Sequence, residues 1–183
     1  MKTFKPFAAT VALVCISCFA GCSSTPKSPA VADAIRHALD QSGYKNVSVS
    51  QDRDKGVVTL TGNVAADTDK ANAQSIAQGI AGAQVVADEI QVLPPGNESA
   101  TKDVNADLDD GISKNLEAVF IQDNFKRDVS FDVKNGVVTL KGTVASQARR
   151  AKAEKVAIGV PNVAQVVNEL QVKGQKATST QMR

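Results

Sequence analysis

The feature that most constrains this chain is a strand-like segment that occurs twice. Gly-Val-Val-Thr-Leu-Lys-Gly at 136–142 repeats Gly-Val-Val-Thr-Leu-Thr-Gly at 56–62. Shifting the chain by 80 residues lays 56–92 on 136–172 without a gap, and sixteen of these 37 pairs are identical. Such self-similarity marks an internal structural repeat. Each copy opens with Gly and alternates β-branched residues with Thr, which is typical of a strand.

The elements around this strand follow the same order in both copies. In the first copy, apolar residues at helical spacing predict a helix over 31–41, and alternating Val and Ser predict a strand near 47–50. The repeated strand, an Ala-rich helix and a last strand over 85–92 follow. We therefore predict an α+β fold of two tandem α-β-β-α-β domains. Each is expected to be a three-stranded mixed sheet with two helices on one face.

Composition divides the chain into segments around these two domains. Small polar residues precede domain 1, and Pro-Pro-Gly at 94–96 separates the copies, so the domains are expected to fold independently. The predicted segments are a signal peptide at 1–21, a flexible tether at 22–30, domain 1 at 31–93, a linker at 94–104, domain 2 at 105–173 and a polar tail at 174–183.

The first 22 residues have the pattern of an export signal. Two lysines give a positive start, an apolar run follows, and Ala-Gly precedes Cys22. The run is too short to cross a bilayer, which takes about 20 apolar residues. The ending Phe-Ala-Gly-Cys resembles a bacterial lipobox, which implies that Cys22 is lipid-modified. Ordinary cleavage nearby, leaving a soluble periplasmic protein, is the alternative.

The charge and the single histidine exclude several classes of function. Removing the two signal lysines leaves 19 basic and 19 acidic residues, which argues against nucleic acid binding through bulk charge. His37 is the only histidine and has no cysteine or carboxylate at ligand spacing. A Ser-His-Asp set and a His-rich metal site are therefore ruled out. We expect no enzyme, no cofactor and no metal.

The repeated motifs resemble the BON domain, a small module of bacterial envelope proteins. The likeness rests on the glycine-flanked strand at 136–142, the Ala-rich helix closing at 153–160 and the final strand at 166–172. A lipobox followed by two such domains is similar to the outer-membrane lipoproteins of this family that face the periplasm. The resemblance implies phospholipid binding and a role in envelope integrity or osmotic-stress tolerance.

Two stretches of domain 2 are candidates for contact with a membrane. A basic concentration on its second predicted helix suits anionic phospholipid head groups, although a solvated helix face has the same appearance. Apolar residues at the end of its first predicted helix are the second candidate, although such residues more often fill a core. The basic candidates are Arg149, Arg150, Lys152 and Lys155, and the apolar candidates are Phe120, Ile121 and Phe125.

A different class of function would use the sheets themselves. Two small sheets have exposed strand edges, and such edges can bind an extended segment of another protein. The alternative to phospholipid contact is therefore a periplasmic scaffold that binds an envelope protein partner.

Overall fold

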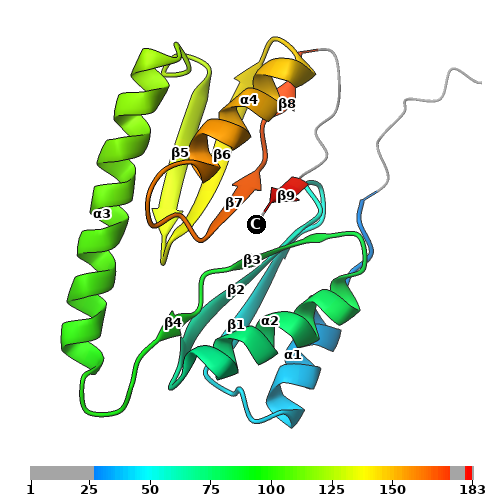
Figure 1. Cartoon of the computed structure of the whole chain (residues 1–183). Coiled ribbons are helices and arrows are strands. Elements are labelled where there is room, and N and C mark those ends of the chain that lie inside the picture. Colours follow the sequence, from blue (N-terminus) through cyan, green and yellow to red (C-terminus); the bar gives the residue numbers. More distant parts are fainter. Residues whose placement is uncertain (1–26, 174–179, 183) are drawn as a thin grey trace, which may run out of the picture.

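The computed structural model describes residues 27–173 and 180–182, and it contains two repeated α+β units (Figure 1). Cys22 and the predicted signal peptide lie outside the described residues. In each unit two helices cover one face of a mixed sheet, so the predicted fold class is confirmed.

Domain 1 has one antiparallel and one parallel pair of strands. β1 pairs antiparallel with β2, whereas β3 and β4 both pair parallel with β2. β3 and β4 are therefore one strand position, interrupted at Glu89 and Ile90. The elements are α1 (Ala32–Gln41), β1 (Val47–Asp52), β2 (Val57–Val64), α2 (Asp67–Ala81), β3 (Val85–Asp88) and β4 (Gln91–Val92).

Domain 2 repeats this arrangement and adds one strand. β6 pairs antiparallel with β5 and parallel with β7 and β8, and β9 pairs antiparallel with β7. The elements are α3 (Glu98–Gln122), β5 (Val129–Lys134), β6 (Val137–Val144), α4 (Gln147–Ile158), β7 (Gln165–Asn168), β8 (Gln171–Val172) and β9 (Thr180–Met182).

Each domain has its own apolar core between the sheet and its two helices. Val58 and Leu60 of β2 are fully buried in the first core, and Val138 and Leu140 of β6 take the same places in the second. The period-two alternation of the repeated strand therefore correctly predicts which residues face the helices.

The last glycine of the repeated strand is required by the backbone. Gly62 and Gly142 have φ of 112° and 127°, a region that favours glycine. A Cβ atom at Gly142 would lie 2.2 Å from the Asp128 carbonyl oxygen, and one at Gly62 would lie 2.0 Å from that of Asn46. Both copies therefore end this strand with glycine because the preceding strand passes too close for a side chain.

Three predicted boundaries differ from the structure. α3 begins at Glu98, so most of the predicted linker 94–104 is helical; its first turns are exposed and carry no apolar periodicity to reveal them. Ser28, in the predicted tether, exchanges hydrogen bonds with Arg53: its N–H donates to the Arg53 carbonyl (2.9 Å) and its carbonyl accepts from Arg53 Nε (2.7 Å). In the predicted polar tail, β9 satisfies the open edge of β7.

The two domains meet through the faces of their sheets that carry no helices. β3 and β7 are neighbours where the domains meet (Figure 1). A third apolar cluster lies there, built from side chains of both domains that alternate with the core residues. Its members are Val57, Val85, Ala87, Val137 and Val167, all of them buried. The domains therefore have separate cores but share one small apolar contact.

Candidate functional site

The basic helix α4 and the end of α3 form one surface at the outer end of domain 2. The Ser146 hydroxyl accepts a hydrogen bond from the Arg149 N–H (3.2 Å) and so caps the N-terminus of α4. The Arg149 guanidinium lies over the Phe125 ring at 4.6 Å, and the Lys152 ammonium lies 5.9 Å from the same ring. The two predicted candidate stretches are thus in direct contact.

The apolar candidates divide between core and surface. Phe120 and Phe125 are buried, with ring centroids 5.6 Å apart, and Phe131 of β5 packs edge-on against Phe120. Ile121 is 51% exposed beside them. The two phenylalanines are therefore core residues. Of the three apolar candidates, only Ile121 presents its side chain to solvent.

Arg150 does not belong to the exposed basic row. It is only 8% exposed, and its Nε and Nη2 donate to the Leu170 and Asn168 carbonyl oxygens at 3.0 Å each. Burial lowers the pKa of the guanidinium, and the nearby Glu154 carboxylate partly offsets this. The prediction that Arg150 contacts a membrane is therefore wrong. Its guanidinium is buried and binds the main-chain carbonyl groups on either side of the interruption between β7 and β8.

Lys70 of domain 1 occupies the position equivalent to Arg150. Its ammonium donates to the Ile90 carbonyl oxygen (2.8 Å), as Arg150 does to Leu170. The neighbouring polar residues complete a matching set in each domain: one cation, one carboxylate and one amide. These sets are Lys70, Asp88 and Gln74 in domain 1, and Arg150, Glu154 and Asn168 in domain 2.

This set was not predicted from the sequence, although a signal for it exists. Aligning the two copies pairs Lys70 with Arg150 in a helix whose other charges have changed. Asp88 and Asn168 both accept from the N–H two residues on, at Ile90 (3.2 Å) and Leu170 (3.1 Å). A cation retained at one helical position beside a retained Asp or Asn marks a structural pair rather than a binding surface.

We call the exposed part of this surface the basic end. Its loop side surrounds a surface hollow of about 420 Å³ that both Ile121 and Arg149 line. Three cations are paired, Arg149 with Asp128 (3.2 Å), Lys152 with Asp123 (2.7 Å) and Lys126 with Glu117 (2.8 Å). Arg127 and Lys155 form no ion pair within 27–173 and 180–182. The basic end consists of Ile121, Lys126, Arg127, Arg149, Lys152 and Lys155.

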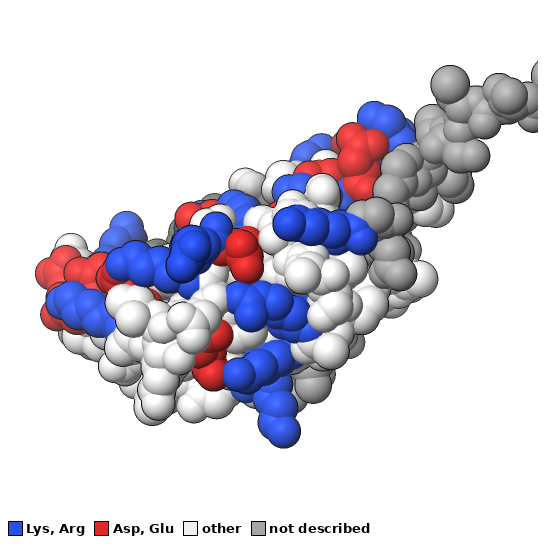
Figure 2. All heavy atoms as spheres, turned by 90° about the horizontal axis from the view of Figure 1, so that it is seen from above, with Lys and Arg blue, Asp and Glu red and all other residues white. Residues whose placement is uncertain are grey.

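The charge of this end is visible from outside. Seen from above, where domain 2 is uppermost, the molecule shows Lys and Arg side chains spread among uncharged residues, with fewer Asp and Glu between them (Figure 2). Domain 1 carries Asp69, Asn72 and Ser75 where α4 carries Arg149, Lys152 and Lys155. The basic end is therefore a property of domain 2.

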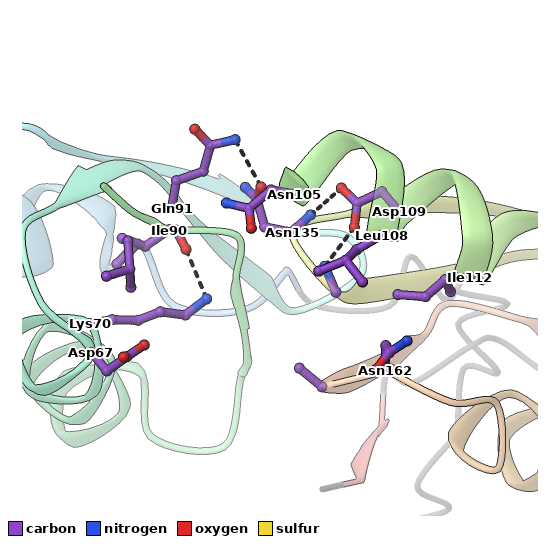
Figure 3. Close-up of a pocket in the computed structure, with 13 residues that line it drawn as sticks. Asp67, Lys70, Ile90, Gln91, Asn105, Leu108, Asp109, Ile112, Asn135 and Asn162 are labelled. Atoms are coloured by element: carbon purple, nitrogen blue, oxygen red, sulfur yellow. Dashed lines mark hydrogen bonds between the residues drawn. The ribbon is translucent and has the colours of Figure 1, made fainter. Parts of the chain in front are cut away.

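A second hollow, of about 400 Å³, lies between the domains (Figure 3). Several of its polar groups are engaged inside the protein: Lys70 with the Ile90 carbonyl, and Asp109 with the N–H groups of Asn135 (2.7 Å) and Gly136 (2.8 Å). Asn135 and Gly136 have φ of 51° and 76°, as a two-residue hairpin turn of this sequence requires. Asp109 thus holds the hairpin of domain 2 in place, and Lys70 holds the strand interruption of domain 1.

Neither a metal site nor a membrane span is found in the part of the chain that the structure describes. There, no three or more His, Cys, Asp and Glu side chains gather in a way that could hold a metal ion. His37 is exposed on α1. None of the helices in the same part is long and apolar enough to cross a bilayer.

Comparisons with known proteins agree with the repeat. The model of one protein family, the BON domain, matches residues 28–94 and again 108–174. Osmotically-inducible protein Y of Escherichia coli (strain K12) is 31% identical over 147 residues, which cover 79% of this chain and 72% of that protein. Two solved structures of CdsD, a structural protein of the type III secretion system of Chlamydia trachomatis, are 14% identical. They cover 75% of this chain and 90% and 94% of theirs, and TM-scores of 0.35 and 0.33 support no conclusion.

Proposed function

Because the chain belongs to the BON-domain family and carries two BON domains, we propose that it is a non-enzymatic, lipid-anchored envelope protein that contacts phospholipid and supports osmotic-stress tolerance. The relative named for osmotic induction supports the stress role. The single observation that carries the lipid contact is the basic end, where Lys126, Arg127 and Arg149 line a surface hollow together with the exposed Ile121.

The basic end suits an anionic head group for two reasons. Each Lys or Arg near a negatively charged membrane surface contributes about 1 kcal/mol of attraction. Arg127 and Lys155 offer their full charge, whereas Arg149 and Lys152 share theirs with carboxylates on the neighbouring loop. Ile121 adds an apolar side chain that can enter the interfacial region. The attraction is modest, so a separate anchor would supply most of the membrane affinity.

That anchor is proposed to be the lipid on Cys22. A lipidated Cys22 would hold the protein on the periplasmic side of the outer membrane. The change Cys22→Ala tests this: the variant should move from the membrane fraction to the soluble fraction after its signal is processed. A processed variant that stays in washed membranes would refute the lipid anchor.

Vesicle co-sedimentation of protein without the anchor tests the basic end. The triple variant Arg127→Gln, Lys152→Gln, Lys155→Gln should bind anionic vesicles at least tenfold more weakly than the wild type at low salt, because three contributions of about 1 kcal/mol are removed. Arg149 is left unchanged because it also holds the Asn124 carbonyl and the Phe125 ring. Gln preserves helix propensity in α4.

A matched control removes three exposed lysines elsewhere, with the same change in net charge. The variant Lys45→Gln, Lys102→Gln, Lys114→Gln should keep wild-type binding. Equal losses in both triple variants would show bulk charge rather than a site. Absence of vesicle binding by the wild type would instead favour the protein scaffold, for which β1 and β5 offer open edges since each pairs with one described strand only.

A further inference from the structure

Two ion pairs, one from each domain, join the two domains. Lys55, in the turn before β2, reaches the interruption between β7 and β8, and Lys134, the last residue of β5, reaches the interruption between β3 and β4. Lys55 Nζ lies 2.7 Å from Glu169 Oε2, and Lys134 Nζ lies 3.0 Å from Glu89 Oε2. Glu89 and Glu169 are 80 residues apart and therefore equivalent in the repeat. The two ion pairs thus use equivalent glutamates, whereas their lysines come from different positions of the two hairpins.

The hairpin of domain 2 adds neutral hydrogen bonds to its half of this contact. The Asn135 side chain donates to the Glu89 carbonyl oxygen (2.7 Å) and accepts from Gln91 (2.9 Å), as the dashed line between the two side chains shows (Figure 3). Asp109 holds the same hairpin from within domain 2. The hairpin is therefore held by Asp109 within domain 2 and contacts domain 1 through the Asn135 side chain.

Gln165 closes the centre of the contact. Its side chain, at the start of β7, donates to the Val86 carbonyl oxygen (2.7 Å) and accepts from the Asp88 N–H (3.0 Å). These are main-chain groups of β3 that no described strand pairs. The Asp88 N–H thus donates a hydrogen bond across the boundary between the domains, which makes it a local reporter of whether the domains are together.

The balance of forces in this contact makes it sensitive to salt. Its apolar part consists of only four valines and one alanine. Both ion pairs lie at the solvent boundary: the lysine side chains are 40% and 57% exposed, and the glutamates 8% and 16%. Salt reduces the attraction between such charges, since the Debye length falls from about 10 Å at 0.1 M to about 3 Å at 1 M. Because the apolar contact is small, weakening both ion pairs changes the equilibrium between closed and open domains.

We infer that the paired domains act as a sensor of ionic strength, in which the Lys55–Glu169 and Lys134–Glu89 pairs keep the helix-free sheet faces closed at low salt and release them as salt rises. This function goes beyond the proposed membrane contact and does not rest on it, because neither ion pair involves a residue of the basic end. Release would expose the apolar residues that the two faces now cover.

Native-state amide hydrogen exchange of the Asp88 N–H tests this inference, because exchange detects rare openings of a folded protein. The protein without its anchor is measured in solution, without vesicles, between about 0.05 M and 1 M NaCl. Screening of two pairs predicts that Asp88 exchanges about tenfold faster at high salt, which corresponds to about 1.4 kcal/mol. Amides in the middle of β2 and β6 should keep their rates, since the domain cores do not open.

Two pairs of variants separate the proposed ion pairs from general effects of salt. In Lys55→Met with Lys134→Met, Asp88 exchange should already be fast at low salt and should change less than about threefold with NaCl. The control variant Lys126→Met with Lys141→Met removes ion pairs to Glu117 and Asp132, both inside domain 2. It should retain the wild-type salt response.

A neutral osmolyte separates ionic strength from osmolality. Sucrose at the osmolality of the NaCl series should leave Asp88 exchange unchanged or slower, because excluded osmolytes favour buried surface. The inference is overturned if Asp88 exchange in the wild type is insensitive to NaCl. An equal acceleration in sucrose, or a full salt response in the Lys55→Met, Lys134→Met variant, overturns it too. Vesicle binding plays no part in these readouts, so failure of the membrane proposal would leave them intact.

Discussion

Replacing Arg150 with Met should destabilise domain 2 by about 3 kcal/mol. The guanidinium makes two hydrogen bonds of 3.0 Å to the carbonyl oxygens of Asn168 and Leu170, in a site that is almost closed to water. Hydrogen bonds to a charged group contribute about 1.5–3 kcal/mol each. Removing one member of a buried charge pair costs about 3–5 kcal/mol, and Met returns part of this through apolar contact.

The loss is large because the remaining partners stay buried. The Glu154 carboxylate accepts a hydrogen bond from Asn168 Nδ2 (2.8 Å) and is itself buried. In the Arg150→Met variant this negative charge would remain in a low-dielectric site without its cation. Adding Glu154→Gln should therefore recover part of the loss, because the amide carries no charge that must be desolvated.

Urea denaturation of the whole protein, followed by circular dichroism, measures the effect. With a slope of about 1.5–2 kcal/mol/M, a loss of 3 kcal/mol moves the midpoint of the domain 2 transition down by roughly 1.5–2 M. The exposed neighbour Lys155→Met is the control and should move it by less than about 0.5 kcal/mol. A loss below about 1 kcal/mol in Arg150→Met would refute the structural role of this cation.

A stricter test of the buried polar residues of domain 2 is to replace them with the residue types found at the same positions in domain 1. In domain 1 the residues at the equivalent positions, beside the interruption between β3 and β4, are Lys70, Gln74 and Asp88. The triple variant Arg150→Lys, Glu154→Gln, Asn168→Asp copies these residue types into domain 2 and should lie within about 1 kcal/mol of the wild type, since coupled neighbours are not additive. A triple variant as unstable as the sum of its single changes would show that charge balance does not govern this site.

Three further predictions concern the backbone, a cap and pH. Gly142→Ala should lower the unfolding temperature of domain 2 by more than about 5 °C, because a Cβ would meet the Asp128 carbonyl oxygen at 2.2 Å, and differential scanning calorimetry measures it. Ser146→Ala should cost about 1 kcal/mol in urea denaturation through the lost cap of α4. Hydrogen bonding to Glu169 raises the pKa of Lys55 above 10.5. The contribution of the Lys55–Glu169 pair to the contact between the domains is therefore complete below pH 10.5 and is lost as the pH rises through the raised pKa. Small-angle X-ray scattering should therefore show the domains together up to about pH 10.5, and separation near neutral pH would contradict this.

The repeated strand made most of the fold predictable from the sequence. Its period-two pattern identifies the buried Val58, Leu60, Val138 and Leu140, and its closing glycines mark the close approach of the preceding strand. These features depend on local geometry, which a short stretch of residues determines. The elements that were missed, the first turns of α3 and the strand β9, carry no such local pattern. The strand β9 forms because the distant strand β7 offers it an edge.

The candidate site was predicted only in part because charge alone does not reveal burial. Arg149 and Arg150 are adjacent, yet the 100° step between them turns one guanidinium to the surface and the other into the domain. The helical row of Arg149, Lys152 and Lys155 was visible in the spacing. Lys126 and Arg127 were not part of the prediction, since the loop that carries them approaches α4 only in the folded domain.

The comparison of the two copies separates the surfaces that hold the molecule together from the surface that faces outward. Val57 and Val137 of the shared cluster are identical in both copies, and so are Glu89 and Glu169 of the reciprocal ion pairs. On the second helix the exposed positions differ in charge, and only domain 2 is basic there. The copies thus share some residues of the contact between the domains, whereas the exposed charges of their second helices differ. Contact through the basic end would therefore involve one domain, while a response to ionic strength would need both.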